Sequence, residues 1–220
     1  MLNYKKLAVT AALSASILTG CFGPKPEEQI YTIFEHAATQ EKTLYKDAAS
    51  LEELEKQNQQ LYAKIIQDGK ENNEPAKEAL SQATKGIQDR EAVLNKERDA
   101  LDKAQKELKD TDKYMKQLED SKLKKQGEKV ESLYKERYAD FQHMYDAYKK
   151  ALTAEKALYD MLGAKTEKVK TISDKVKEVN QLYAEVESNK EKFNTHTKDY
   201  NKEKVAFYKQ ANFKIEEKTK

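Results

Sequence analysis

Hydrophobic residues recur at every third or fourth position along most of this chain, with polar residues between them. This spacing places the hydrophobic side chains on one face of an α-helix and is typical of amphipathic helices that pack against one another. The pattern predicts long helices over residues 26–67, 75–119, 128–162 and 169–216.

The second predicted helix carries the most regular pattern in the sequence, a hydrophobic residue at every seventh position. The series is Leu80, Ile87, Leu94, Leu101, Leu108 and Met115. A strict repeat of seven residues favours a left-handed twist of helices around one another, as in coiled coils.

Glycine and proline mark the places where we expect the helices to end. Asp68-Gly69 and a polar stretch separate the first helix from Pro75, at the start of the second. We place the next turn in residues 120–127, and the end of the third helix at Gly163. Gly86 interrupts the second predicted helix, where we expect it to allow a close contact between helices.

Amphipathic helices joined by short turns predict an all-α fold. The simplest packing is an elongated antiparallel up-and-down four-helix bundle with coiled-coil-like packing. The alternative is a three-helix bundle in which two successive helices fuse into one long helix through a glycine, since glycine costs only about 1 kcal/mol inside a helix.

The beginning of the chain has a different pattern. Lys5 and Lys6 precede an apolar run over Leu7–Ile17, which is the layout of an export signal and is too short to span a bilayer as a mature helix. The run ends in Leu18-Thr19-Gly20-Cys21, which resembles the lipobox of bacterial lipoproteins. That resemblance implies that the signal is cut before Cys21 and that the Cys21 thiol takes a diacylglyceryl group.

These features divide the chain into three parts. Residues 1–20 are a lipoprotein signal peptide, residues 21–26 are the lipidated cysteine with a short tether, and residues 27–220 are a helical domain. The alternative is an ordinary secretory signal followed by an incidental cysteine. Because Cys21 is the single cysteine of the sequence, an exported chain has no use for it in an internal disulfide. We therefore expect a lipid-anchored protein on the extracytoplasmic face of the cell membrane.

The exported part of the chain is expected to carry no net charge. The sequence has 41 Lys+Arg and 39 Asp+Glu, and removal of Lys5 and Lys6 leaves 39 of each. Nucleic acid is therefore not an expected partner. Charged residues make up 36% and hydrophobic residues 38% of the sequence, which favours narrow hydrophobic seams between helices over a thick core.

A group of lysines lies at the expected turn between the second and third helices: Lys122, Lys124 and Lys125. In an up-and-down bundle anchored near its N-terminus, this turn returns to the membrane, and so does the C-terminal segment. The lysines of that segment are Lys214, Lys218 and Lys220. We expect these charges to face anionic lipid headgroups. The alternative is a solvated loop with no partner.

Residue patterns typical of enzymes are missing from the sequence. The histidines, His36, His143 and His196, fall on different predicted helices, and no nucleophile–histidine motif or glycine-rich phosphate loop occurs. Asp140-Phe141-Gln142-His143 is a weak variant of the Glu-x-x-His motif of di-metal bundles, which requires a second copy. We therefore expect no catalytic residue, no metal and no cofactor.

Aromatic residues are the remaining candidates for binding, because the sequence has 13 Tyr and 6 Phe but no Trp. They are densest on the third predicted helix, at Tyr134, Tyr138, Phe141, Tyr145 and Tyr148. An exposed strip of such rings could stack on the sugars of wall glycans. The alternative is that the rings fill a lean core, and their spacing fits both interpretations.

The signal with its paired lysines, the lipobox, the proline-containing tether and the Lys/Glu-rich helical body with a tyrosine-rich third helix together resemble the YkyA-type cell-wall-binding lipoproteins of Firmicutes. The similarity extends over the full chain. It implies a helical bundle outside the membrane with a role in cell-wall binding, and it carries over no catalytic residue.

The favoured function is therefore non-enzymatic. We expect a membrane-anchored lipoprotein that binds or scaffolds at the cell wall, with peptidoglycan or wall polymers as partners. The alternative is a helical module that pairs with another protein or a second copy through an open heptad seam. An enzyme or a solute receptor is disfavoured, because the alternating strand patterns of two-lobed receptors are missing.

Overall fold

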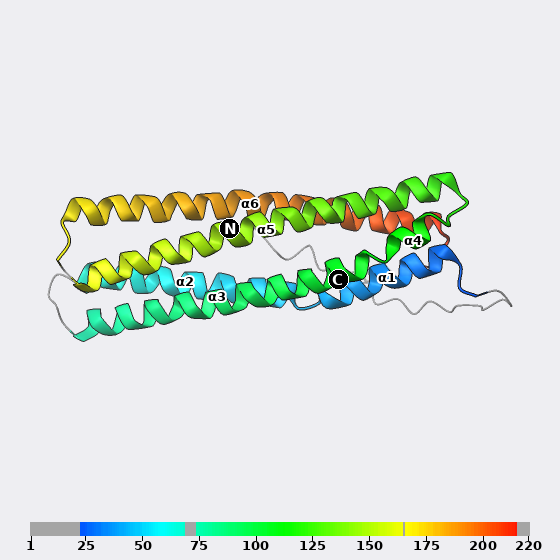
Figure 1. The fold of residues 1–220 in the computed structure, drawn as a ribbon. Helices are drawn as coiled ribbons and strands as arrows, with labels where there is room; N and C mark the ends of the chain where they lie inside the picture. Colours follow the sequence, from blue (N-terminus) through cyan, green and yellow to red (C-terminus); the bar gives the residue numbers. More distant parts are fainter. Residues whose placement is uncertain (1–22, 69–73, 165, 215–220) are drawn as a thin grey trace. The chain divides into compact units, whose positions relative to one another are not determined.

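A computed structural model describes residues 23–68, 74–164 and 166–214, and the regular elements within these ranges are all α-helices (Figure 1). They are α1 (Pro26–Gln40), α2 (Leu44–Asp68), α3 (Glu74–Leu108), α4 (Thr111–Met115), α5 (Ser121–Ala164) and α6 (Val169–Gln210). The predicted all-α class is confirmed.

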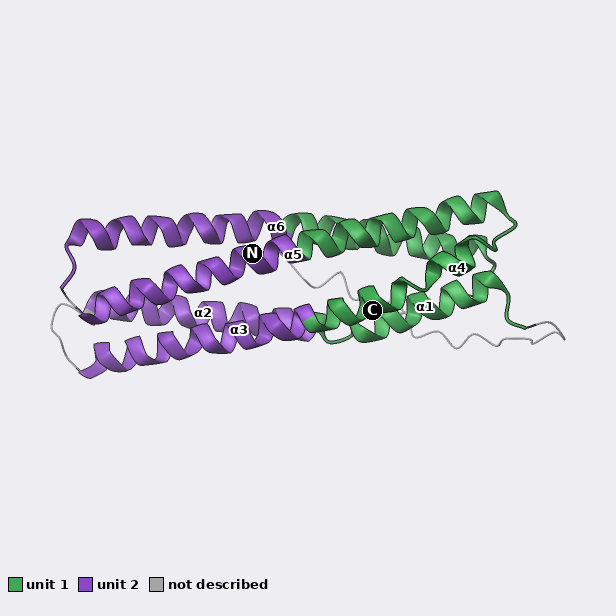
Figure 2. Ribbon diagram, viewed as in Figure 1, with its two compact units in different colours: residues 1–45, 99–141, 191–220 green, residues 46–98, 142–190 purple. Residues whose placement is uncertain are grey.

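The chain divides into two compact units, which are coloured separately in Figure 2. Unit 1 consists of residues 1–45, 99–141 and 191–220, and unit 2 consists of residues 46–98 and 142–190. Each unit therefore takes one stretch from each of the four predicted helices, so that each is built as a four-helix arrangement of its own.

Contacts within each unit show that successive long helices run in opposite directions. In unit 1, Gln126 of α5 bonds to Glu203 of α6, and Arg137, further along α5, bonds to Thr197, further back on α6. In unit 2, Arg98 and then Arg90 of α3 bond to Tyr145 and then Glu155 of α5. This is the up-and-down order that the sequence predicts, and the alternative with one fused helix does not occur.

The first predicted helix is interrupted, which the hydrophobic spacing does not reveal. Residues 41–43 separate α1 from α2, and the Leu44 N–H bonds to the Glu41 carbonyl, three residues back, at 3.0 Å. Two hydrophobic positions on either side of the interruption, Ala37 and Leu44, are seven residues apart. Because a tightened turn changes the direction of the chain without changing this spacing, the prediction of one continuous helix over 26–67 is wrong.

The heptad series of the second predicted helix is confirmed as a core-forming stripe. Leu80 is half-buried, and the other five members are buried. A second series with the same seven-residue spacing is also buried on this stretch, and it is small or polar instead of aliphatic: Ala76, Ala83, Arg90, Glu97, Ala104 and Thr111. The core therefore contains polar groups that a search for hydrophobic periodicity passes over.

The turn expected at residues 120–127 lies earlier, between α4 and α5 at residues 116–120. The Asp120 carboxylate accepts the backbone N–H groups of Lys122 and Leu123, at 2.7 and 3.2 Å, and so begins α5 at Ser121. Gly127 is inside α5, where a Cβ atom would lie 2.6 Å from the Met115 side chain. This glycine is thus a site of close packing and not a turn.

The remaining helix ends lie near their predicted positions. Gly163 is the penultimate residue of α5. The end of α6 is at Gln210, several residues before the predicted end at 216, because Asn212 takes a left-handed conformation with φ 62°. The Phe213 N–H then bonds back to the Tyr208 carbonyl at 2.9 Å, which closes the helix.

Candidate functional site

The predicted lipidation site, Leu18-Thr19-Gly20-Cys21, lies outside the described residues. The described chain begins at Gly23, and α1 starts at Pro26, five residues after Cys21. Proline suits the first turn of a helix because its missing N–H has no partner there, and Glu27 and Glu28 follow it. Whatever is attached at Cys21 is therefore joined to the helical body by a very short segment.

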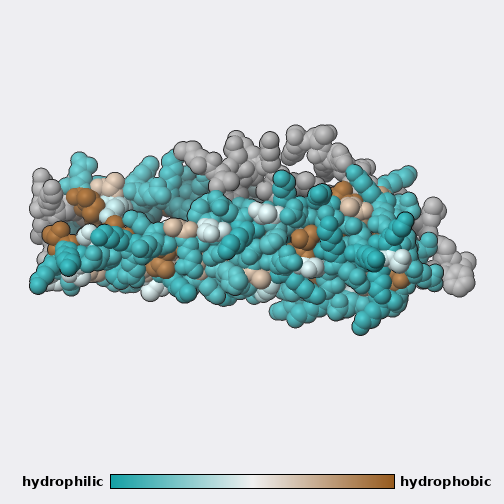
Figure 3. Space-filling view, turned by 90° about the horizontal axis from the view of Figure 1, so that it is seen from above, coloured by the Kyte–Doolittle hydropathy of each residue, from teal (hydrophilic) through white to brown (hydrophobic). Residues whose placement is uncertain are grey.

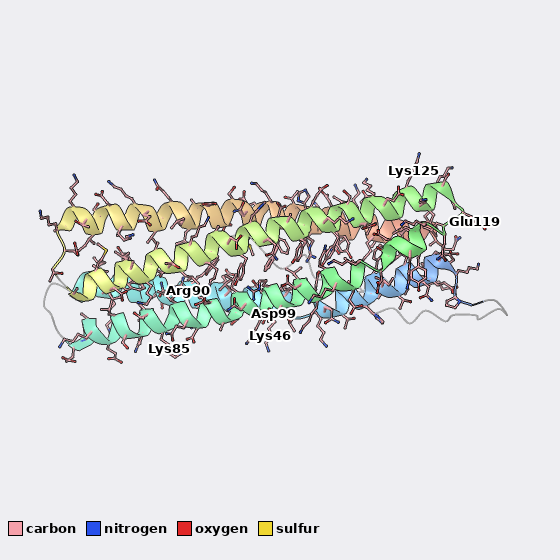
Figure 4. All side chains as sticks on the ribbon, viewed as in Figure 1. Lys46, Lys85, Arg90, Asp99, Glu119 and Lys125 are labelled. Atoms are coloured by element: carbon pink, nitrogen blue, oxygen red, sulfur yellow. The ribbon has the colours of Figure 1, made fainter. Side chains whose placement is uncertain are left out.

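The predicted basic group occupies the first turn of α5. Lys122 and Lys125 are exposed and Lys124 is half-buried. Lys125 points away from the neighbouring helices in Figure 4. Lys214, which was grouped with these lysines, is exposed after the end of α6, and Lys218 and Lys220 lie outside the described residues.

Three segments of unit 1 meet at the end where α1 begins. The short helix α4 contacts α1. Met115 at the end of α4 lies beside Gly127 of α5, and the ring of Phe213 packs on Tyr31 of α1 with 4.6 Å between the centroids. The start of α1, the α4–α5 turn and the end of α6 are therefore neighbours, as the up-and-down order predicts.

The tyrosines of the third predicted helix do not form an exposed strip. Tyr134, Phe141, Tyr145 and Tyr148 are buried, and Tyr138 is half-buried. An exposed ring face is needed for stacking on a sugar, so the interpretation of these residues as an aromatic strip on the surface is wrong. The alternative, in which these rings fill a lean core, is confirmed.

The hydroxyl groups of these tyrosines explain how so many rings can be buried. Tyr134, Tyr138 and Tyr148 each donate a hydrogen bond of 2.6 Å to a carboxylate on another part of the bundle. The acceptors are Glu41, Asp102 and Glu55, respectively. A buried hydroxyl without an acceptor would cost free energy, and a carboxylate is a strong acceptor. The tyrosines thus join helices by specific polar pairs as well as by packing.

In unit 1 the largest polar cluster is centred on Arg137 of α5. Its guanidinium donates two hydrogen bonds of 2.8 Å to the two oxygens of Glu41 and a third, also 2.8 Å, to Thr197 of α6. The charge also lies 4.9 Å from the centre of the Phe193 ring. Glu41 is in the interruption between α1 and α2, so this bidentate pair joins the interruption to α5.

In unit 2 the corresponding cluster is centred on Arg90 of α3. Its guanidinium donates to Glu155 of α5 at 2.9 Å and to the Tyr183 hydroxyl of α6 at 2.7 Å. Glu155 also accepts hydrogen bonds from Tyr183, from Tyr159 and from the Asn58 side chain of α2. One carboxylate therefore holds all four long stretches of unit 2 together (Figure 4 labels Arg90).

Glu97 is a buried acid of a different kind. It lies seven residues after Arg90 on α3 and is 5% exposed. Burial, together with the negative charges of Asp47 and Glu55 on α2, raises the pKa of its carboxyl to about 8. Burial also raises the pKa of Glu55, although the hydrogen bond from Tyr148 opposes the shift. Glu97 is therefore a group whose charge is costly to the folded state.

Sequence reasoning missed these polar core residues, because it searched each predicted helix for hydrophobic positions. The seven-residue spacing itself could have found two of them. Arg90 and Glu97 continue the series of Ala76 and Ala83 at the same interval. For Arg137 and Glu155 we find no comparable signal.

No cluster of three or more metal-ligating side chains occurs in the part of the chain that the structure describes. His36 and His143 are exposed. The two ring nitrogens of His196 face different acids, Asp140 at 2.5 Å and Glu136 at 3.3 Å, so that the acids do not converge on one point with the ring.

None of the helices over residues 23–68, 74–164 and 166–214 has the length and hydrophobicity needed to cross a membrane. The large hydrophobic side chains exposed in these ranges are Tyr45, Ile66 and Val169. On the face drawn in Figure 3, hydrophobic residues form small separate spots on a mostly hydrophilic surface.

Known proteins are similar to this chain in sequence or in fold. A family model with the description "YkyA: Putative cell-wall binding lipoprotein" matches residues 25–210. The chain is 27% identical over 201 residues to the "Uncharacterized lipoprotein YkyA" of Bacillus subtilis (strain 168), a match that covers 91% of this chain and 90% of that protein. A crystal structure of a conserved protein of unknown function from Staphylococcus aureus is similar in fold, with a TM-score of 0.67 and 19% identity over 86% of this chain and 98% of that one.

The family match includes all of the described helices, from the residue before α1 to the last residue of α6. Its extent is the extent of the helical body, which starts after the lipobox-like segment and the tether. The chain belongs to the YkyA family of lipoproteins.

Proposed function

We propose that this protein is a lipoprotein held to the outer face of the cell membrane through a diacylglyceryl group on Cys21, and that its helical body binds or scaffolds at the cell wall without enzymatic activity. The observation that carries the proposal is the position of Cys21. The sole cysteine of the sequence ends a lipobox and stands five residues before a helical body that belongs to a lipoprotein family.

The short tether supports an anchor that keeps the body near the membrane. Two acyl chains hold a protein to a bilayer far more firmly than one, so no further hydrophobic segment is needed. The hydrophilic helical body fits a location outside the bilayer.

Binding at the wall is supported by the description of the family. The buried rings of the third predicted helix leave the polar helix surfaces as the place where peptidoglycan or a wall polymer would be contacted. Hydrogen bonding by exposed Lys, Glu, Asn and Gln side chains suits such hydrated polymers.

The alternative, a module that pairs through an open heptad seam, has less support. The seam is filled by helices of the same chain, and exposed hydrophobic side chains among the described residues are scattered. Broad apolar patches are what mark surfaces for helix pairing.

Two experiments test the proposal. The first measures the mass of the N-terminal peptide of the mature protein and the membrane retention of a Cys21→Ser variant. A diacylglyceryl mass on Cys21 and release of the variant are expected. An unmodified Cys21 would refute the anchor.

The second experiment sediments the protein with purified cell walls, with and without their anionic polymers, at moderate salt. We expect the protein in the wall pellet. Recovery of all protein in the supernatant would remove wall binding while leaving the anchor intact.

A further inference from the structure

Several lysines of the α4–α5 turn of unit 1 are unpaired among the residues that the structure describes. Lys116, Lys122, Lys124 and Lys125 make no salt bridge with any acid in the described part of the chain. Many other lysines of the chain do, such as Lys85 with Asp89 and Lys156 with Asp160. Residues 116–125 contain these four lysines and two acids, Glu119 and Asp120, which gives the turn a net charge of +2.

These lysines also stand where they weaken the helix that carries them. The N-terminus of a helix has a partial positive charge, which favours acids and disfavours lysines in the first turn. The first turn of α5 has no acid. Asp120, directly before it, is already engaged by two backbone N–H groups. The three lysines therefore do not stabilise the helix at this position. A negatively charged partner outside the chain would give a reason for their presence.

The position of the turn indicates which partner this is. The α4–α5 turn lies at the end of unit 1 where α1 begins, and Phe213 places Lys214 at the same end. Cys21 precedes Pro26 by five residues, which span at most about 18 Å when fully extended. A lipid anchor at Cys21 would therefore hold this end of unit 1 close to the headgroups at all times.

We propose that the α4–α5 turn docks on the anionic headgroups of the membrane that holds the anchor, through Lys122, Lys124 and Lys125 with Lys116 beside them. This inference depends on the anchor proposed above. Because the anchor would keep the α4–α5 turn near the membrane, the turn would meet the lipid headgroups at a high effective concentration. Each basic side chain at an anionic surface adds attraction that falls off over about 8 Å at physiological salt. Docking fixes the tilt of unit 1 against the bilayer, which attachment at a single point would leave free.

The test uses the lipidated mature protein in vesicles, with a donor dye on a cysteine introduced as Gln117→Cys, an exposed residue of the turn. The acceptor dye is on a lipid headgroup. Energy transfer is compared between vesicles of phosphatidylcholine and vesicles rich in phosphatidylglycerol. We expect about twofold higher transfer on the anionic vesicles, lost as salt is raised.

Two triple variants separate docking from a general charge effect. Lys122→Gln, Lys124→Gln and Lys125→Gln together should lower transfer on anionic vesicles to the phosphatidylcholine value. The matched control changes Lys46, Lys56 and Lys64 to Gln, which are exposed on α2 in unit 2 and also lack salt bridges among the described residues (Figure 4 labels Lys46 and Lys125). It carries the same change of charge and should keep the parent's transfer.

Equal transfer by the parent and the turn variant on anionic vesicles at low salt would overturn the inference. So would a loss of the parent's transfer when a phosphate-rich wall polymer is added, because the lysines would then prefer the polymer. Protein that does not float with vesicles at all would refute the anchor, and the inference with it. That outcome is recognised by flotation alone, before any transfer is measured.

Discussion

Arg90 and Glu155 form an ion pair of 2.9 Å in the core of unit 2, where their side chains are 2% and 6% exposed. The charges come from α3 and α5, and the same carboxylate collects donors from α2 and α6. Burying two charges costs several kcal/mol of desolvation per ion, and close pairing with further hydrogen bonds offsets that cost. The pair therefore specifies which helices meet at this level of the bundle more than it adds to stability.

The first prediction concerns the loss of one partner. Glu155→Ala should destabilise the fold by about 3–5 kcal/mol, because it leaves the Arg90 guanidinium buried without a counter-charge. The double variant Arg90→Met, Glu155→Gln should recover much of this loss, since no charge remains and the amide oxygen can still accept a hydrogen bond from the neighbouring Asn58 and tyrosine donors. Urea unfolding followed by circular dichroism gives both free energies. A double variant as unstable as the single one would contradict the interpretation.

The second prediction concerns the tyrosine–carboxylate pairs. Tyr148→Phe should lower the free energy of unfolding by about 1–3 kcal/mol, because it removes the hydrogen bond to Glu55, a largely buried acid. Tyr45→Phe is the control, since Tyr45 is 48% exposed. It should change the stability by less than about 0.5 kcal/mol. If both variants lose the same amount, the hydrogen bond is not the cause.

The third prediction is a dependence of stability on pH that comes from Glu97. Its pKa is raised to about 8 in the folded state, so between about 4.5 and 8 the folded chain keeps a proton that the unfolded chain has released. Stability should therefore fall as pH rises through this window, by up to about 1.4 kcal/mol per pH unit, and level off above it.

Glu97→Gln should remove this part of the pH dependence and stabilise the protein at pH 8, because the amide keeps the shape of the acid without its charge. The matched control is Glu52→Gln on α2, an exposed acid. Thermal unfolding of the three proteins between pH 5 and pH 9 tests the prediction. A parallel pH profile for the parent and Glu97→Gln would refute it.

The fourth prediction contrasts two glycines inside helices. A Cβ atom on Gly86 would meet only Asn58 Oδ1, at an ordinary 3.6 Å, so the close helix contact expected there is not what the structure has. Gly86→Ala should stabilise the fold by about 0.5–1 kcal/mol through better helix propensity. Gly127→Ala should not show this gain, because its Cβ would lie 2.6 Å from Met115 and 3.2 Å from Phe207. Chemical denaturation of the two variants decides, and an equal gain in both would contradict the packing at Gly127.

Much of the fold could be predicted from the sequence, because burial of a helix face leaves a periodic record. The series from Leu80 to Met115 is visible without a structure, and so is the break before Pro75. The interruption at Glu41 is not visible, since the partner that Glu41 meets there, Arg137, is 96 residues away in the sequence. The position of the α4–α5 turn depends on a single capping side chain, Asp120, which the sequence pattern does not distinguish from the polar residues that follow it.

Less of the candidate site could be predicted. The lipobox is a local motif and needs no tertiary structure to be recognised. The exposure of a tyrosine does need it, because Tyr134 and Tyr148 are buried only through acceptors from distant parts of the chain, Glu41 and Glu55. Side chains at adjacent positions on a helix point in different directions. The sequence alone does not show which of them faces another helix that offers a hydrogen-bond acceptor.

The bidentate pair of Arg137 and Glu41 also limits how this family can diverge. A neutral substitution at either position alone leaves the other charge in the interior without a partner. Such a single substitution is expected to persist only where a second substitution removes the remaining charge. Homologues that replace Glu41 by a neutral residue are therefore expected to have lost the positive charge at position 137 as well. The two positions should covary among homologous sequences.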